Sequence, residues 1–205
     1  MREMITGVVD ASAARFALIG SLLIVLLQAG GPEWIETLRW DRGALAEFEW
    51  WRLWSGHLVH ASWAHVGLNV FGLLLIGWLF PEPVPLRTHI ARFAWLALAC
   101  SVLLYLLRPQ LGWYVGLSGV LHGSFVIGLW WLWRQGDGLA LLLLAGLVAK
   151  LAWEHVHGPL TSDEELVGVP VETAAHSFGA LAAVVWLLVA GGLAFARRRR
   201  HNGAP

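Results

Sequence analysis

Apolar residues dominate six long stretches of this chain, and polar residues gather in the segments between them. The apolar stretches cover roughly residues 14–30, 61–80, 89–107, 113–133, 139–157 and 172–196. A helix of about 20 apolar residues can cross a bilayer, so each stretch is expected to form a membrane-spanning helix. Proline and glycine mark several of the ends, as in Pro81–Pro85 and Gly136–Gly138. The pattern predicts an all-α, polytopic membrane protein whose single domain covers residues 1–205.

The composition agrees with a membrane protein. Hydrophobic residues make up 58% of the chain and charged residues 14%, whereas charged residues are about a quarter of a soluble domain. The formal net charge is zero, so no nucleic-acid partner is indicated. Cys100 is the only cysteine, which excludes an intrachain disulfide and a CxxC metal site. Its apolar surroundings predict a small buried side chain.

Arginines in the short loops predict the orientation of the chain, because positive residues favour the cytoplasmic side of a bilayer. With six spans, both termini share one side, and that side carries nine arginines: Arg2, Arg15, Arg87, Arg92, Arg134 and Arg197–Arg200. The opposite side carries four: Arg39, Arg42, Arg52 and Arg108. Both termini are therefore expected in the cytoplasm.

Two longer loops, 31–60 and 157–170, are then expected outside. The first is rich in tryptophan, a residue that prefers the headgroup layer, and holds Trp34, Trp40, Trp50, Trp51 and Trp54. We expect this loop to lie on or in that layer, although an aromatic belt alone would explain most of these residues.

Unusual polar residues occur in the outer parts of three spans that all run inward. The second span carries His60, His65 and Asn69, the fourth carries Ser118 and the sixth carries His176. Ser118 and His176 each follow the predicted outer end of their span by about five residues. At about 1.5 Å per residue, both are expected on the order of 7 Å below those ends. Polar residues within spans usually face a cavity or one another, so the cluster is a candidate functional site.

These residue types fit covalent catalysis by serine. Ser118 becomes a nucleophile if a neighbouring base takes its proton, and His176 is the candidate base. Asn69, His65 and the Ser118 amide can donate hydrogen bonds to a developing oxyanion. Glu172 precedes His176 by one turn and could orient the imidazole, or it could be a first-turn acid stabilised by the helix N-terminus.

Glycines flank the serine in Gly116-Leu-Ser118-Gly119. Gly116 and Gly119 would let a substrate backbone approach closely. Serine and glycine are also common where membrane helices pack together, so this motif by itself is weak. The joint occurrence of serine, imidazole and amide at one predicted depth favours catalysis.

The chain resembles the rhomboid family of intramembrane serine proteases. The resemblance is carried by motifs that occur in family order: Trp51-Arg52, His60-x4-His65-x3-Asn69, Gly116-x-Ser118-Gly119 and Ala175-His176-x2-Gly179. It implies a six-helix bundle in which a Ser118–His176 dyad hydrolyses peptide bonds of membrane-protein substrates near the outer boundary of the bilayer. It further implies a membrane-embedded first loop and a fifth span that acts as a lateral gate.

One departure from the commonest rhomboid pattern lies one turn after the serine, where His122 replaces a frequent tyrosine. The stretch GLSGVLHG, the short chain and the compact loops resemble the rhombosortase branch. That branch implies substrates with a C-terminal tag made of a glycine-rich motif, an apolar helix and an arginine cluster. It also implies the inner membrane of a bacterium, with the active site toward the periplasm. A general rhomboid protease with other substrates is the alternative.

Three further residues keep two interpretations each. His122 shares a helix face with Ser118 and could stack on or hydrogen-bond to His176, or it could simply bond to a carbonyl in helix packing. Lys150 and Glu154 lie four residues apart in the fifth span, where charge is costly. They could form a mutual salt bridge, or they could line the gate and contact a polar or glycine-rich cleavage region.

Two other function classes are weighed against the protease. Nine histidines allow a metal- or haem-binding membrane protein, with His60, His65 and His157 as conceivable zinc or copper ligands. The sequence lacks an HExxH motif and paired histidines in the middle of spans, so no metal or cofactor is expected. A rhomboid-like protein that binds client helices without cutting usually lacks the serine or the histidine, and this chain has both.

Overall fold

The structure, a computed structural model, describes residues 12–159 and 161–202, with side chains described except at 161–163 and 193–202. The predicted all-α fold is confirmed, with one short pair of strands. In chain order, the elements are α1 (Ser12–Ala29), α2 (Pro32–Leu38), β1 (Trp40–Asp41), α3 (Arg42–Ala46), α4 (Arg52–Ser55), α5 (Trp63–Leu79), α6 (Leu86–Leu107), β2 (Trp113–Tyr114), α7 (Ser118–Arg134), α8 (Leu139–His157), α9 (Thr161–Val167) and α10 (Ala174–Asn202).

Several helices are suited to a bilayer. Among the described residues, four helices are long and apolar enough to cross it: α1, α6, α8 and the part of α10 over Ala174–Gly192. Helix α5 is apolar but shorter, with 17 residues, and α7 also has 17. The chain is therefore a polytopic membrane protein, while the count of six spans stays a prediction.

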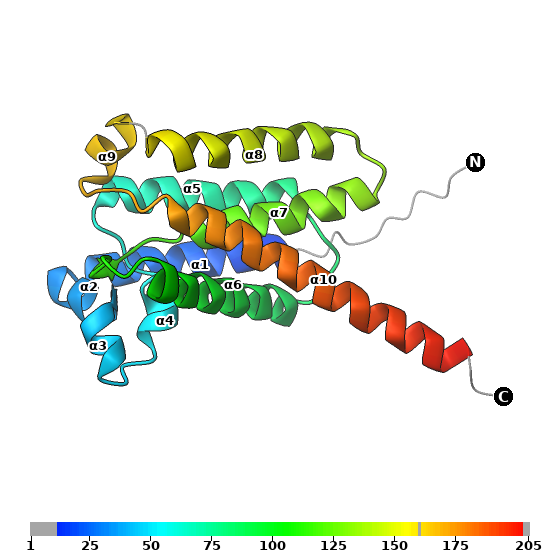
Figure 1. The fold of residues 1–205 in the computed structure, drawn as a ribbon, viewed down its shortest axis with the longest axis horizontal. Coiled ribbons are helices and arrows are strands. Elements are labelled where there is room, and N and C mark those ends of the chain that lie inside the picture. The colour runs from blue at the N-terminus through cyan, green and yellow to red at the C-terminus, as the bar shows by residue number, and fades with distance from the viewer. Residues whose placement is uncertain (1–11, 160, 203–205) are drawn as a thin grey trace.

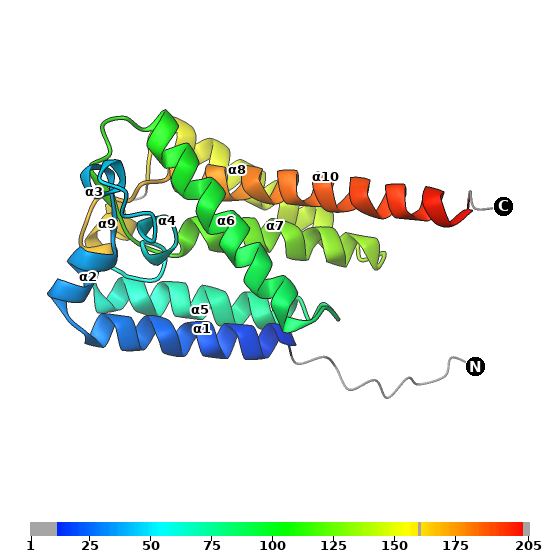
Figure 2. The same cartoon turned by 90° about the horizontal axis from the view of Figure 1, so that it is seen from below.

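The long helices form one bundle, in which α1 packs beside α5 and α10 crosses α7 and α6 (Figures 1 and 2). Helix α8 lies at the edge of the bundle next to α7 (Figure 1). The short elements α2, α3 and α9 gather at one end (Figure 1). The turn between α7 and α8 lies at the other end, with the start of α1 (Figure 1).

Helices α7 and α10 touch through their backbones. A Cβ atom added at Gly179 would lie 1.8 Å from the Gly119 carbonyl oxygen, and one added at Gly123 would lie 2.6 Å from the Gly179 carbonyl oxygen. Side chains would hold the two helices apart, so small residues at this crossing allow the close contact. Gly119 was expected to admit a substrate backbone. Instead it admits α10, since a Cβ there would meet the Ala175 carbonyl oxygen at 2.8 Å.

The start of α7 differs from the prediction. The helix was expected from about residue 113, but it begins at Ser118, because Trp113 and Tyr114 pair as a strand with Trp40 and Asp41 of the first loop. Likewise α10 begins at Ala174 rather than near residue 172. The serine is thus at the first position of its helix, so the predicted five residues of helix before it are not present.

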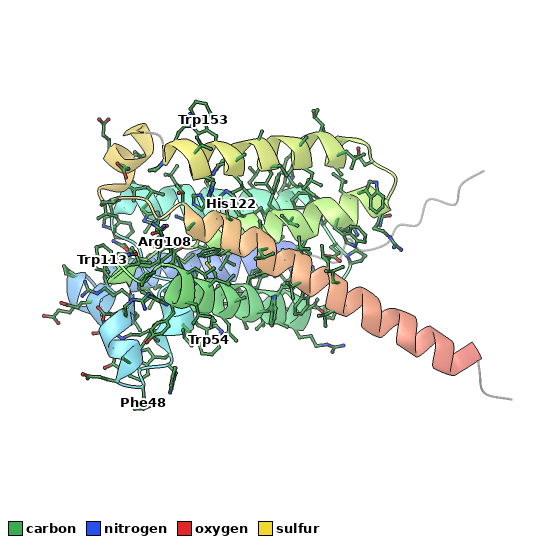
Figure 3. The ribbon with its side chains drawn as sticks, in the orientation of Figure 1. Phe48, Trp54, Arg108, Trp113, His122 and Trp153 are labelled. Atoms are coloured by element: carbon green, nitrogen blue, oxygen red, sulfur yellow. The ribbon has the colours of Figure 1, made fainter. Side chains whose placement is uncertain are left out.

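The first loop is more structured than an aromatic belt. Trp40 is fully buried and the Trp54 ring nitrogen donates to the Ala94 carbonyl at 2.9 Å, so these two tryptophans are packing residues. Trp34, Trp50 and Trp51 are about half exposed, as expected for an interfacial loop. Phe48 stands at the tip of this region, beyond α3 (Figure 3). The position of the first loop in the headgroup layer stays a prediction.

The segments that carry the described arginines of the two groups lie at opposite ends of the bundle. The starts of α1 and α6 and the end of α7 lie at one end, and the first loop and the α6–β2 connection lie at the other (Figures 1 and 2). Arg2 lies outside the described residues, and the side chains of Arg197–Arg200 are not described. Which end faces the cytoplasm stays a prediction.

Candidate active site

The segment before Ser118 brings the serine to the N-terminus of α7. Gly116 has φ +115°, and a Cβ there would lie 2.6 Å from the His65 ring, so both the conformation and the space require glycine. The Gly116 amide donates to the Gly56 carbonyl at 3.0 Å, and the Tyr114 hydroxyl donates to the Gly116 carbonyl at 2.8 Å. Burial raises the pKa of the Tyr114 phenol, which keeps its proton available for this bond.

Ser118 and His176 face each other across the α7–α10 crossing. The Ser118 hydroxyl oxygen lies 3.0 Å from His176 Nε2. His176 is the third residue of α10 and is buried, with 7% of its surface exposed. The structure therefore brings together the two side chains that the sequence analysis paired, at hydrogen-bonding distance.

A carboxylate that was not predicted to touch His176 completes this contact. Glu154 of α8 places Oε2 2.9 Å from His176 Nδ1. Two roles were considered for Glu172, and its contacts match the one at the start of the helix rather than orientation of the imidazole. One Glu172 oxygen accepts from the Ala174 amide at the start of α10, and the other lies 3.2 Å from Arg108. Glu172 thus lies two residues before α10 and accepts from the first amide of that helix, which is close to the first-turn acid considered from the sequence.

Lys150 and His122 continue the series of polar contacts from Glu154 back to Ser118. Lys150 Nζ lies 2.6 Å from Glu154 Oε1 and 3.1 Å from His122 Nε2. His122 Nδ1 lies 2.8 Å from the Ser118 carbonyl oxygen, and its ring stacks on His176 with centroids 4.2 Å apart. Figure 3 shows His122 between α8 and α10. The salt bridge considered for the fifth span is present. His122 both stacks on His176 and bonds to a carbonyl, two of the contacts considered for it.

The predicted oxyanion donors lie on α5. The Ser62 hydroxyl accepts from the His65 amide at 3.1 Å and caps this helix, and Asn69 Nδ2 donates to the His65 carbonyl at 2.9 Å. His60 is fully buried behind them, with its ring 4.8 Å from that of His65. His60 therefore supports His65 from the side and is not among the residues that line the cavity described next.

One cavity of about 540 Å³ joins these groups. Its polar lining comes from α5, α7, α8 and α10, from the segment before α10 and from the segment that joins α6 to α7: His65, Asn69, Gln110, Tyr114, Ser118, His122, Lys150, Glu172 and His176. Its other walls are mostly apolar and include Leu68, Trp113, Leu121 and Val169. An apolar pocket of this size with a few convergent polar groups is typical of a binding or active site.

The conceivable metal site is not assembled. His157 stacks on Trp153 at the end of α8, with centroids 3.9 Å apart, and Figure 3 shows Trp153 projecting away from the bundle. Among the residues that the structure describes, no group of three or more His, Cys, Asp or Glu side chains could hold a metal ion. His60 and His65 instead contact each other through their rings, and His157 stacks on Trp153.

Glu154 is the site residue whose contact with the imidazole was missed. The signal in the sequence was a carboxylate inside an apolar span, one of the most costly groups to bury. Its pairing with Lys150 offered a sufficient local explanation, and the distance of 22 residues to His176 hid the second contact.

Comparison with known protein families gives a match between residues 47–192 and the Rhomboid domain. The matched region covers more than half of the chain and runs from the first loop into α10, so it contains every polar residue of the cavity. Comparison with curated proteins gives no match.

Proposed function

The chain belongs to the rhomboid family of intramembrane serine proteases, and we propose that it is an endopeptidase with Ser118 as nucleophile and His176 as general base. The observation that carries the proposal is the 3.0 Å contact between the Ser118 hydroxyl and His176 Nε2 at the wall of a cavity. A serine hydroxyl is a weak nucleophile until a base at this distance accepts its proton.

The reaction proceeds by acyl transfer. Ser118 Oγ attacks the carbonyl carbon of the scissile peptide bond while its proton passes to His176 Nε2. The tetrahedral intermediate collapses, the C–N bond breaks and the imidazolium gives its proton to the leaving amine. Water then attacks the acyl-serine ester with His176 again as base, which releases a carboxylic acid and restores the hydroxyl.

The oxyanion of the intermediate is stabilised by donors around the N-terminus of α7. The Ser118 amide is one of the first helical amides, which have no partner within the helix. The side chains of Asn69 and His65 line the same cavity, and we assign them as the other donors. Removing one donor of this kind costs on the order of 10²–10³-fold in rate.

The substrates are membrane proteins whose cleavage site unwinds into the cavity. The apolar walls fit side chains that leave the lipid, and a glycine-rich segment unwinds at low cost because glycine is a poor helix former. The rhombosortase assignment fits this chemistry, with a C-terminal tag of glycine-rich motif, apolar helix and arginine cluster. In that assignment the protein lies in the inner membrane of a bacterium, with six spans, cytoplasmic termini and the cavity toward the periplasm.

Ser118→Ala tests the proposal directly. A fluorophosphonate probe should label the purified wild type covalently and should not label the variant, because the hydroxyl that attacks phosphorus is gone. In cells, mass spectrometry of secreted proteins should show tagged C-termini retained in the variant and removed in the wild type.

Ser124→Ala is the matched control, because Ser124 lies on the same helix and does not line the site cavity. It should label like the wild type. Persistent labelling of Ser118→Ala would remove Ser118 from the mechanism. Normal removal of tags by that variant, with labelling lost, would favour a general rhomboid protease with other substrates.

A further inference from the structure

Glu154 places a carboxylate where burial is unfavourable without hydrogen-bond or ionic partners. It is a carboxylate within the apolar helix α8, with 9% of its side chain exposed. Glu154 lies one turn before the end of α8 at His157, and a carboxylate buried there without partners would be costly. Its two oxygens have separate partners, His176 Nδ1 at 2.9 Å and Lys150 Nζ at 2.6 Å.

The donor and acceptor roles along the contacts from Ser118 through His176 to Glu154 have one consistent assignment. An ionised carboxylate can only accept, so His176 Nδ1 carries a proton and donates it to Glu154. In a neutral imidazole the other nitrogen is then an acceptor, and His176 Nε2 is free to accept from the Ser118 hydroxyl. This is the tautomer that a general base needs.

The neighbouring groups enforce the same assignment. The Ser118 carbonyl can only accept, so His122 Nδ1 donates to it and His122 Nε2 accepts from the Lys150 ammonium. The ammonium also donates to Glu154 Oε1. Lys150 therefore favours the ionised form of Glu154, and the neutral His122 ring can stack on His176 without a second positive charge.

We propose that Glu154 is a positioning residue that holds His176 in the base-competent tautomer and stabilises the imidazolium formed when Ser118 attacks. The proposal rests on the proposed serine protease function. It makes the working unit a triad of hydroxyl, imidazole and carboxylate taken from three helices, α7, α10 and α8.

The charged and titratable groups around His176 come from every helix packed near it. Glu154 and Lys150 face it from α8, His122 from α7 and His65 from α5 across the same cavity. Helix α6 contributes the Cys100 thiol, which lies 3.6 Å from the Ala175 carbonyl oxygen. Glu154 is the group whose negative charge directly stabilises a protonated His176 imidazole, so its removal is the informative change.

The test is the rate of fluorophosphonate labelling as a function of pH. Glu154→Gln should lower the plateau rate on the order of 10²–10⁴-fold. At acid pH the labelling rate falls because a protonated His176 cannot act as base. This fall, the acid limb of the pH–rate curve, should move to lower pH by about one unit or more, because the imidazolium has lost its counter-charge. Glu154→Asp keeps the charge and should keep the acid limb in place with a smaller fall in the plateau.

Glu165→Gln is the matched control, an exposed carboxylate on α9 that should label like the wild type. If Ser118→Ala is unlabelled while Glu154→Gln keeps the wild-type rate and limb, the positioning role is wrong and the proposed function stands. If Ser118→Ala is labelled, the proposed function itself is wrong.

A purely structural role of Glu154 would lower the plateau rate equally in the Gln and Asp variants without moving the acid limb. Thermal unfolding of each variant in detergent reports folding separately.

Discussion

At the scale of single residues, buried histidines outside the spans tie the first loop to the bundle. His57 is fully buried, and its Nε2 lies 3.1 Å from the Ala97 carbonyl oxygen and 3.0 Å from the Ser101 hydroxyl. Ser101 donates in turn to the Leu53 carbonyl at 2.7 Å, so the ring nitrogen is the donor. Burial lowers the pKa of His57 to about 4, and burial together with the neighbouring His65 lowers that of His60 to about 3.

These two imidazoles predict a loss of stability in acid. Below about pH 6.5 the unfolded chain takes up protons, while the folded protein keeps His57 and His60 neutral until pH falls to about 4 and 3. The free energy of unfolding should therefore fall as pH drops below about 6.5, by up to roughly 1.4 kcal/mol per pH unit for each imidazole. Thermal unfolding in detergent between pH 7.5 and 4.5 measures the slope.

His60→Phe keeps a ring of similar shape and removes one titrating group, so its stability should depend less steeply on pH than that of the wild type. His155→Gln is the control, since His155 is exposed on α8. It should keep the wild-type slope. An unchanged slope in His60→Phe would show that the His60 ring is not held neutral in the fold.

At the scale of helices, the distance between Ser118 and His176 depends on how closely α7 and α10 approach. Ser118 and His176 lie at the starts of these helices, and the glycines that let the backbones touch lie within the next turns. Cys100 of α6 fills the space beside this contact, with its thiol against the Ala175 carbonyl. The predicted burial of Cys100 is confirmed.

Gly179→Ala should separate these two helices. Its methyl group would overlap the Gly119 carbonyl of α7, so α10 must shift by an ångström or more. Because a misplacement of this size at a catalytic pair costs on the order of 10²-fold, labelling of Ser118 by a fluorophosphonate should fall by about that factor.

The control is Gly146→Ala on α8, where an added Cβ meets nothing within 4 Å. It should label at the wild-type rate, since alanine is a better helix former and causes no clash. Equal rates for the two variants would mean that the α7–α10 contact does not set the Ser118–His176 distance.

At the scale of the whole molecule, the cavity opens near one end of the bundle and the α7–α8 turn lies at the other. Arg108 and Trp113 mark the first end in Figure 3. In the proposed orientation the first end faces the periplasm and the second the cytoplasm. The distribution of arginines supports this orientation, because positive residues stay on the cytoplasmic side.

Single added cysteines can test this orientation. Gly112→Cys lies in the connection before β2, and Gln135→Cys lies in the α7–α8 turn, both at exposed positions. In cells with a permeabilised outer membrane, an impermeant maleimide should label Gly112→Cys and leave Gln135→Cys unlabelled until the cells are lysed. The wild type is the control, because its Cys100 is buried and should stay unlabelled. Labelling of Gln135→Cys before lysis would contradict the orientation.

The sequence alone determined the class of fold and the family, and it supplied the hypothesis for the chemistry. Long apolar stretches must form helices in lipid, because each helix satisfies its backbone hydrogen bonds internally. This argument placed α8 at its observed bounds and most other long helices within a few residues. The serine, the imidazole and the family followed from residue types and motif order, and the family is confirmed.

Tertiary structure decided the parts that depend on contacts between distant segments. Pairing of β2 with β1 moved the start of α7 to Ser118, and packing of the first loop buried Trp40, which local composition assigned to an interfacial belt. The choice of Glu154 over Glu172 as the partner of His176 was also made at this level. Helical periodicity tells which residues share a face, but only the packing of α8 against α7 and α10 determines which face meets the imidazole.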